Sequence, residues 1–483
     1  MTTFARDMEK VLQNIGDGIT VVSDTLCGWP LFILLIGGGL WLFLYSGMVS
    51  LRHLPESLRI LREGNGRAEA ADGVRRADQI SSVQALASVV AATVGMGNIA
   101  GVAIALVMGG PGAIFWMWVS AIVGMCTKYH EGVLAIKYRG TDPDGRPQGG
   151  PMHVIRRGLG ERWSWLASFF AVAGMAGTLC IMNANQLTEA AVSVFFTPDA
   201  IQSGTWLNAV ASATGLDNLH SLRLIIGLAV ASVVAIVVLG GIKRIARVAS
   251  VLVPFMVGAY FIIVAYIIVT NLSAVPGVIH SIFAEAFNLR AGIGALAGIA
   301  LIGARRAMLI NDAGVGTASL MHGASRNTSP VREGLVAMLG PAIDSGLVCT
   351  LTAIAILIGV DLSEVDGMQG LSIAMTAFGR TVPAGAYLLM LIVLCFALSS
   401  MFSYSYYGHT CATYLFGARR ARYYTIFFIA TLVVFAVIPV GAAVGMCDLF
   451  YALMAFPTMT AVLLLAPEVK QETAKYFSNK ERQ

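Results

Sequence analysis

The sequence predicts an all-α polytopic membrane protein with about 11 transmembrane helices. Of its 483 residues, 57% are hydrophobic and 12% are charged, whereas a soluble domain carries about 25% charged residues. Several uncharged apolar runs, such as 31–50, 248–270 and 423–446, reach the roughly 18 residues that span a bilayer. These runs are continuous rather than alternating, which excludes a transmembrane β-barrel.

The expected spans follow one another closely, and no polar stretch is long enough for a separate soluble domain. They lie near 30–50, 84–107, 111–136, 165–195, 222–241, 246–270, 292–321, 334–360, 383–415, 422–440 and 442–466. A short charged tail follows at 467–483. We therefore expect one transmembrane domain over residues 1–483.

Positively charged side chains gather in alternate loops. Arginine and lysine are frequent after the first, third, fifth and ninth expected spans and scarce in the loops between them. Because cytoplasmic loops carry this excess, the N-terminus is expected outside and the C-terminus in the cytoplasm. That orientation requires an odd number of spans, which agrees with the expected count. Basic cytoplasmic loops and a compact chain fit a multi-pass protein of a bacterial inner membrane.

Two expected spans are interrupted by paired glycines. The segments 92–101 and 311–319 each place a Gly-x-Gly beside Asn or Asp in the middle of an apolar run. Glycine costs about 1 kcal/mol in a helix interior relative to alanine, and unwound backbone at membrane depth persists only where it lines a cavity or is buried in protein. Such paired breaks indicate inverted repeats around a central binding site. The alternative is that these glycines only permit close helix packing.

The breaks lie five spans apart, so a repeat of that length is inverted in the membrane. We expect a first repeat at about 84–270 and a second at about 292–466. One extra N-terminal span precedes them at about 30–50, and the tail 467–483 is expected to be cytoplasmic.

Enzymatic motifs are missing from the sequence. It contains no P-loop, no H-E-x-x-H and no G-x-S-x-G nucleophile elbow. The seven cysteines lack C-x-x-C spacing and are expected to be packing residues. We expect neither an enzyme nor a cofactor, and no nucleic-acid partner. The oligomeric state is not predicted.

The motifs, taken together, carry a resemblance. They are Val94-Gly-Met-Gly-Asn-Ile-Ala-Gly-Val-Ala103, Lys128-Tyr-His-Glu131, Gly149-Gly-Pro-Met152, Asn311-Asp-Ala-Gly314, Cys349-Thr-Leu-Thr-Ala353 and Ser405-Tyr-Tyr-Gly408. In this order and spacing the chain resembles the alanine or glycine:cation symporter family over nearly its whole length. The resemblance implies five-plus-five inverted repeats of the leucine-transporter type after one extra N-terminal helix. It also implies import of a small neutral amino acid with sodium, or with protons in some members.

The chain departs from the family pattern at positions where specificity is expected. Asn183 stands where Gln is usual, Leu309 replaces an aromatic residue, and Tyr404 follows Ser403 in place of Gly-Trp. Asn183, Leu309 and Tyr404 are therefore expected to shape the pocket around the substrate side chain, with ordinary packing as the alternative for Leu309 and Tyr404. These changes leave room for an amino acid somewhat larger than alanine or glycine.

The backbone of the two breaks supplies the remaining expected substrate contacts. Backbone amides at Gly95 and Gly97, where a half-helix restarts, are expected to hold the substrate carboxylate, because side chains there would block its approach. Carbonyls at Leu309 and Asn311 are expected to hold its ammonium group.

A sodium site is expected from a pair of serines. Ser399 and Ser400 match the hydroxyl pair that this fold uses, together with carbonyls near Ala91, Val94 and Phe396. Hard cations prefer such oxygen ligands. The alternative is that both hydroxyls bond only to carbonyls of their own helix.

Two acidic residues, Asp312 and Asp344, lie in otherwise apolar spans. An ionisable group there costs about 2.5–3.5 kcal/mol on insertion scales, so function is the default hypothesis. Asp344 is expected to join Asn98 at a second cation position or to carry a proton. Asp312 has either a coupling or a structural role, with Arg305 and Arg306 as candidate partners.

Glu131 with Lys137 and Arg139 is expected to form an ion-pair cluster at a cytoplasmic helix end. The function expected for the whole chain is secondary active symport of a small neutral amino acid with sodium. The alternatives are proton-coupled symport and a transporter-like amino-acid sensor that signals to a partner.

Overall fold

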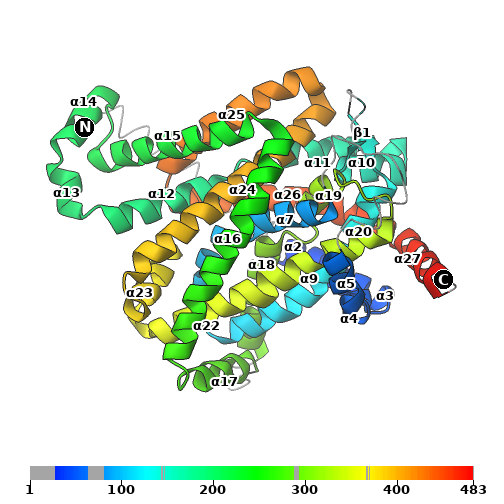
Figure 1. Cartoon of the computed structure of the whole chain (residues 1–483), viewed down its shortest axis with the longest axis horizontal. Coiled ribbons are helices and arrows are strands. Elements are labelled where there is room, and N and C mark those ends of the chain that lie inside the picture. The colour runs from blue at the N-terminus through cyan, green and yellow to red at the C-terminus, as the bar shows by residue number, and fades with distance from the viewer. Residues whose placement is uncertain are drawn as a thin grey trace.

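The computed structural model describes residues 28–63, 81–142, 145, 147–287, 293–365, 368 and 370–481. Nearly all of this chain is helical, and the helices form an intertwined bundle (Figure 1). Within these residues the strands are only β1 (Gly140–Thr141) and β2 (Pro147–Gln148), which form a small antiparallel hairpin. The predicted all-α class is confirmed.

Seven helical stretches of the described chain are long and apolar enough to cross a membrane, and a bent pair of helices raises this to eight. The seven are η4–α12 (Glu161–Phe195), α15 (Asn218–Val238), α16 (Gly241–Thr270), α20–α22 (Pro330–Gly359), α24 (Gly385–Phe416), α25 (Ala418–Val437) and α26 (Val440–Leu464). Each coincides with an expected span. The protein is therefore a multi-pass membrane protein, while the total of about 11 spans stays a prediction.

Two further expected spans coincide with helices of which one is buried over most of its length and the other in its second half. These are α9 (Gly112–Lys137), which carries Lys128 and Glu131 in its second half, and α18 (Ile293–Asn311). The extensive contacts of α9 with α18 and with α20 (Pro330–Ala337) place it at the middle of the molecule.

Breaks divide several of these helices. The fourth expected span consists of α11 (Ser164–Gly177) and α12 (Ile181–Phe195), separated where Cys180 adopts a left-handed φ of 54°. The eighth consists of α20, α21 (Leu339–Pro341), the π-helix η6 (Ala342–Val348) and α22 (Cys349–Gly359). Neither interruption was predicted from the sequence.

Several short helices connect the spans. They are α4 (Val49–Arg52), α5 (Leu54–Glu63), α10 (Pro151–Val154), η3 (Ile155–Leu159), η4 (Glu161–Trp163), α13 (Pro198–Ser203), α14 (Thr205–Thr214), α17 (Val275–Ala286), η7 (Leu362–Glu364) and α23 (Leu371–Thr381).

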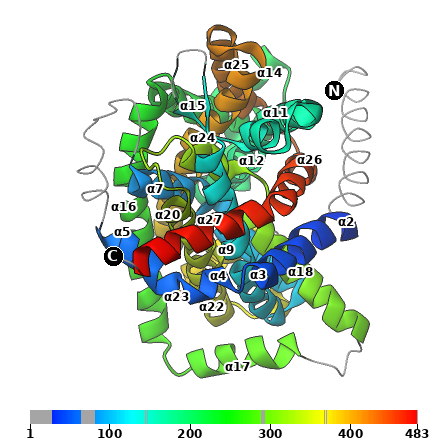
Figure 2. The same ribbon diagram turned by 90° about the vertical axis from the view of Figure 1, so that its right-hand side faces the viewer.

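The expected tail forms a helix, α27 (Ala466–Glu481), which crosses in front of α9 with its end beside α5 (Figure 2). Lys137 at the end of α9 pairs with Glu468 at 2.8 Å, and Lys480 pairs with Glu56 of α5 at 2.5 Å. The tail therefore lies on the same side of the molecule as the basic segment after the first expected span, as the expected orientation requires.

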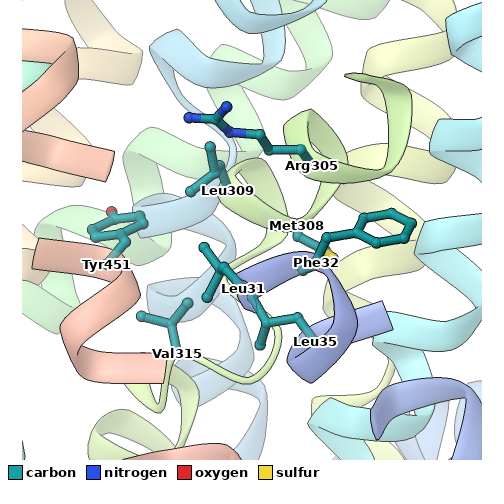
Figure 3. Close-up of a pocket in the computed structure, with 8 residues that line it drawn as sticks. All are labelled: Leu31, Phe32, Leu35, Arg305, Met308, Leu309, Val315 and Tyr451. Carbon is teal, nitrogen blue, oxygen red and sulfur yellow. The ribbon is translucent and has the colours of Figure 1, made fainter. Parts of the chain in front are cut away.

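The N-terminal apolar segment consists of α2 (Trp29–Phe32), η1 (Ile33–Gly37) and α3 (Gly38–Tyr45). Leu31 and Leu35 face Val315 and Tyr451 across a very small cavity (Figure 3). Farther along, a side chain on Gly39 would lie 2.6 Å from Val123 of α9. One face of this segment therefore packs against the core, while Ile33 and Leu44 on its other face are exposed.

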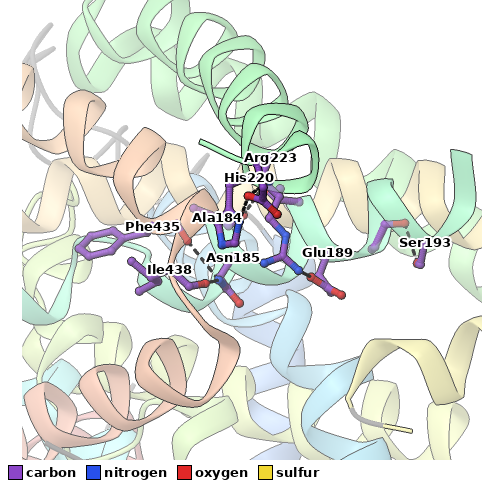
Figure 4. A network of polar contacts seen from close by, with 11 residues as sticks. Ala184, Asn185, Glu189, Ser193, His220, Arg223, Phe435 and Ile438 are labelled. Atoms are coloured by element: carbon purple, nitrogen blue, oxygen red, sulfur yellow. Dashed lines mark hydrogen bonds and ion pairs between the residues drawn. The ribbon is translucent and has the colours of Figure 1, made fainter. Parts of the chain in front are cut away.

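Asn185 joins α12 to the end of α25 (Figure 4). Its Nδ2 donates to the carbonyls of Phe435, at 3.2 Å, and Ile438, at 2.6 Å. The last carbonyls of a helix have no partner within the helix, and Asn185 satisfies two of them. Nearby, Arg223 of α15 pairs with Glu189 of α12 at 2.5 Å, so the three helices are held together by polar contacts.

Replacing Asn185 by Ala is expected to destabilise the protein by about 1–3 kcal/mol, because two buried carbonyls lose their donor. The apparent melting temperature of the purified protein in detergent should fall by a few degrees. Ser193→Ala, on the exposed side of the same helix, is the control. Equal melting temperatures for both variants and the native protein would contradict this role of Asn185.

Candidate functional site

The first predicted break is confirmed. The helix α7 (Ser82–Thr93) ends where Val94 becomes extended, and the chain restarts as the π-helix η2 (Gly97–Gly101), followed by α8 (Val102–Gly109). The two halves meet at 53°. Backbone groups are thus freed in the middle of the fold, where lipid could not satisfy them.

The freed carbonyls of α7 meet the two serines of α24. The Ser399 hydroxyl oxygen lies 3.0 Å from the carbonyl oxygen of Ala91 and 2.9 Å from that of Phe396. The Ser400 hydroxyl oxygen lies 2.9 Å from the carbonyl oxygen of Ala92 and 3.3 Å from that of Ala91. Three carbonyl oxygens and two hydroxyl oxygens therefore lie together with only two hydroxyl protons among them. Because acceptors outnumber donors, this group of oxygens suits a cation.

Of the five residues expected around the cation, the structure brings Ala91, Phe396, Ser399 and Ser400 together. Val94 is buried just after α7, and its amide donates to the carbonyl of Val90 at 2.7 Å. Both serines reach across to another helix, so bonding only within their own helix does not describe them.

Gly95 must be glycine for a reason of space. A side chain there would lie 2.7 Å from the hydroxyl oxygen of Ser400. The Gly95 amide donates to Oδ1 of Asn98 at 2.9 Å, while Asn98 Nδ2 donates to the backbone carbonyl of Asp344 at 3.2 Å. The backbone amide of Asn98 also donates to the carbonyl of Gly95 at 3.1 Å. Asn98 thus stabilises the break through both its side chain and its backbone. Gly97, the first residue of the restarted helix, is left as the better candidate for binding an anion.

The second predicted break, between α18 and α19 (Thr317–His322), is also confirmed. Asp312, Gly314 and Gly316 have positive φ values of 52°, 85° and 93°, whereas Ala313 and Val315 between them do not. Such alternation turns successive amides inward and forms a nest that binds anions.

The anion at this second break is Glu131 of α9. Its Oε1 accepts from the amide of Gly314 at 2.6 Å, and the residue is 2% exposed. The expectation that Glu131 lies with Lys137 in an ion-pair cluster is wrong, because only Lys137, more than a helical turn farther on, reaches the glutamates of α27. Glu131 was missed because its position near a helix end did not reveal which way it faces.

Asp312 is held by hydroxyl groups. Tyr404 donates to Asp312, Thr317 donates to it at 3.1 Å, and the Tyr404 and Tyr451 hydroxyls are 2.7 Å apart. Arg305, expected as a partner of Asp312, instead pairs with Asp448 at 3.0 Å. These contacts favour a structural role for Asp312 and fix the ring of Tyr404.

A cavity of about 70 Å³ lies between the breaks. Among the residues expected at the substrate site, it is lined by Gly95, Gly97, Asn183, Leu309 and Tyr404. Asn311, expected to contribute its backbone carbonyl, is not among the residues that line this cavity, and its side-chain Oδ1 accepts from the amide of Ala313 at 3.0 Å. Ser400 and Ala92 of the cation site also line the cavity.

Other lining residues were not predicted. They are Thr93, Met96, Gly101, Met182, Arg306, Ile310, Cys447, Asp448 and Tyr451. Arg306 and Asp448 are the charged members of this set. Because charged residues within membrane helices are usually functional, both could have been predicted as site residues from the sequence. The apolar members carry no such signal.

Comparison with known proteins places the chain in a family. The Sodium:alanine symporter family matches residues 12–483. The chain belongs to the sodium:alanine symporter family. Sodium/alanine symporter AgcS of Methanococcus maripaludis is 35% identical over 95% of this chain and 96% of its own length. The probable sodium/glutamine symporter GlnT of Bacillus subtilis is 31% identical over 98% of this chain and 92% of its own.

The structure of MhsT in complex with L-phenylalanine is also similar to this member of the sodium:alanine symporter family. The TM-score is 0.53 at 14% identity, over 82% of this chain and 98% of that chain. The leucine-transporter type of fold that the resemblance implied is therefore confirmed. The chain is a transporter rather than an enzyme.

Replacing Glu131 by Ala is expected to loosen the second break, since a hydrogen bond to a charged group contributes about 1.5–3 kcal/mol. Amides of residues 312–316 should exchange with deuterium at least tenfold faster in detergent-solubilised protein. Glu161→Ala removes an exposed carboxylate that pairs with Arg156 and should leave this exchange unchanged. Slow exchange in both variants would show that Glu131 does not hold the break.

Proposed function

We propose that this protein imports a small neutral amino acid together with sodium by alternating access. The observation that carries the proposal is that the candidate cation site and the central cavity share two residues. Ser400 and Ala92 contribute oxygens at the end of α7 and also line the cavity. A cation bound to these oxygens would fix one side of the substrate site. This is a direct physical route from sodium binding to substrate binding.

The proposed sodium ligands are oxygens only. They are the carbonyls of Ala91, Ala92 and Phe396 and the hydroxyls of Ser399 and Ser400, which lie together, with the carbonyl of Val94 as a further ligand expected from the sequence. The carbonyl end of a half-helix carries partial negative charge, and hard cations prefer carbonyl and hydroxyl oxygens. We assign Asn98 a bracing role at the break rather than a direct contact with this ion.

The substrate is proposed to bind with its carboxylate at the start of η2. The amide of Gly97 lies at the positive end of a helix that continues through α8, which favours an anion. Carbonyls at Leu309 and Asn311, where α18 ends, are the proposed partners of the ammonium group. The substrate side chain would then face Asn183, Leu309 and Tyr404.

The cavity favours a substrate of the alanine and glycine class. One water molecule needs roughly 10–15 Å³ of such a cavity, so about 70 Å³ holds only a handful of heavy atoms. Tyr404 cannot turn aside easily, because its hydroxyl is bound to Asp312 and Tyr451. These walls argue against a large side chain.

We further propose a bacterial inner-membrane location, with the N-terminus outside and the C-terminus cytoplasmic. The loop charges support this orientation. We also propose that residues 84–270 and 292–466 are inverted repeats, since the two breaks fall at matching positions of these segments. Rocking of the broken helices against the remaining helices would expose the site to each side in turn.

The substrate class can be tested with purified protein in proteoliposomes. Radiolabelled alanine should accumulate only with an inward sodium gradient, and unlabelled glycine and serine should compete for uptake. Phenylalanine should not compete, because its ring exceeds the cavity. Equal accumulation driven by a proton gradient in sodium-free buffer would instead support proton coupling, and binding without accumulation would support a sensor.

The sodium site can be tested with serine variants of α24. Ser400→Ala should raise the sodium concentration for half-maximal uptake about tenfold, equivalent to about 1.4 kcal/mol. Gly95→Ala should act in the same direction, because its methyl group displaces the Ser400 hydroxyl.

Ser405→Ala is the matched control for this measurement. The Ser405 hydroxyl donates to the carbonyl of Phe402 within its own helix at 2.7 Å, so its loss should not change sodium dependence. If Ser400→Ala behaves like Ser405→Ala, sodium does not bind at these serines.

A further inference from the structure

Lys128 is a fully buried cation at the centre of the molecule. Its side chain lies on α9 with 0% exposure. No hydrogen-bond partner of its Nζ is found among the residues that the structure describes. A buried ammonium is costly unless other charges compensate it, so its surroundings must supply negative charge.

Three buried carboxylates supply that charge. The ammonium is close enough to Glu131, Asp312 and Asp344 to interact electrostatically with each of them. Its Nζ also lies 3.8 Å from the position that a side chain on Gly340 would take, one helical turn before Asp344. Lys128 therefore lies between the second break and η6.

The three carboxylates differ in how they are satisfied. Glu131 binds the amide of Gly314, and Asp312 accepts from Tyr404 and Thr317. Neither carboxylate oxygen of Asp344 has a hydrogen-bond partner in the described part of the chain, although both are buried. Asp344 is thus the carboxylate that most needs a cation.

Neighbouring polar groups meet that need only in part. The Thr93 hydroxyl lies near the Asp344 carboxylate but donates to the carbonyl of Val89 at 3.0 Å, and Asn98 reaches only the backbone carbonyl of Asp344. In the described ranges, no three Asp, Glu, His or Cys side chains are grouped so as to hold one metal ion together. The positive charge that acts on Asp344 is that of Lys128, which interacts with it electrostatically without a hydrogen bond between the two side chains in the described residues.

We propose that Lys128 is a built-in counter-cation for Asp344 and stands in for a second coupling ion. A sodium ion beside Asp344 would meet the ammonium as a like charge in a poorly screened interior. One sodium ion per cycle then suffices, bound at Ser399 and Ser400. This inference rests on the proposed function and replaces the expected second cation position at Asn98 and Asp344.

The native protein provides the first test. Binding of ²²Na⁺ to purified protein in detergent should saturate at one ion per chain. In proteoliposomes loaded with alanine, the transporter should move one positive charge across the membrane for each alanine molecule. The reversal potential gives this ratio. Two ions or two charges would overturn the inference while leaving sodium symport intact. No bound sodium at all would overturn the proposed function itself.

Variants provide the second test. Lys128→Met should bind two sodium ions, because the uncompensated Asp344 recruits one, and the double variant Lys128→Met with Asp344→Asn should return to one. Lys128→Arg keeps the charge and should bind one, as should Lys137→Met, which removes the lysine at the end of the same helix. One ion in a monodisperse Lys128→Met protein would overturn the inference. If Lys128→Met does not fold, the number of charges moved per alanine by the native protein still tests the inference.

Discussion

Backbone polar groups freed inside a membrane must find partners in the protein, and the rest of this structure follows from that constraint. The chain unwinds twice, after α7 and after α18. At each place the surrounding helices supply hydroxyls, amides or carboxylates for the exposed backbone. Two of the helices that do so, α9 and α24, carry buried polar side chains for this purpose, among them Glu131, Ser399 and Ser400.

The two breaks are related in sequence but differ in chemistry. At the second break, the amide nest already binds a carboxylate of the protein, Glu131. At the first break, the restarted helix at Gly97 faces a cavity instead. The nest that is filled from within gives rigidity, whereas the helix end that faces the cavity is available to a substrate. Similar Gly-x-Gly motifs therefore form a turn fixed by the protein itself at the second break and the proposed substrate-binding surface at the first.

The sequence allowed the breaks and much of the cavity wall to be predicted, because glycine pairs and hydroxyls are rare inside apolar spans. Ser399 and Ser400 were predicted because they match the hydroxyl pair of the fold that the resemblance implied. Glu131 was not placed correctly, because a sequence does not give the rotation of a helix about its axis. The contact of α27 with Lys137 was missed since a polar tail carries no signal of what it docks against.

The π-helices at the site determine how the helices that follow them are rotated toward the core. Both η2 (Gly97–Gly101) and η6 (Ala342–Val348) are wider than an α-helix and hold an extra residue in the turn. With about 3.6 residues per turn, loss of one residue rotates everything beyond it by about 100°. The face of α22 that meets the core is therefore set by the length of η6 as well as by its side chains. Single-residue deletions in these two turns should be far more damaging than substitutions at the same positions, and a relative shorter by one residue there would present a different helix face to its substrate.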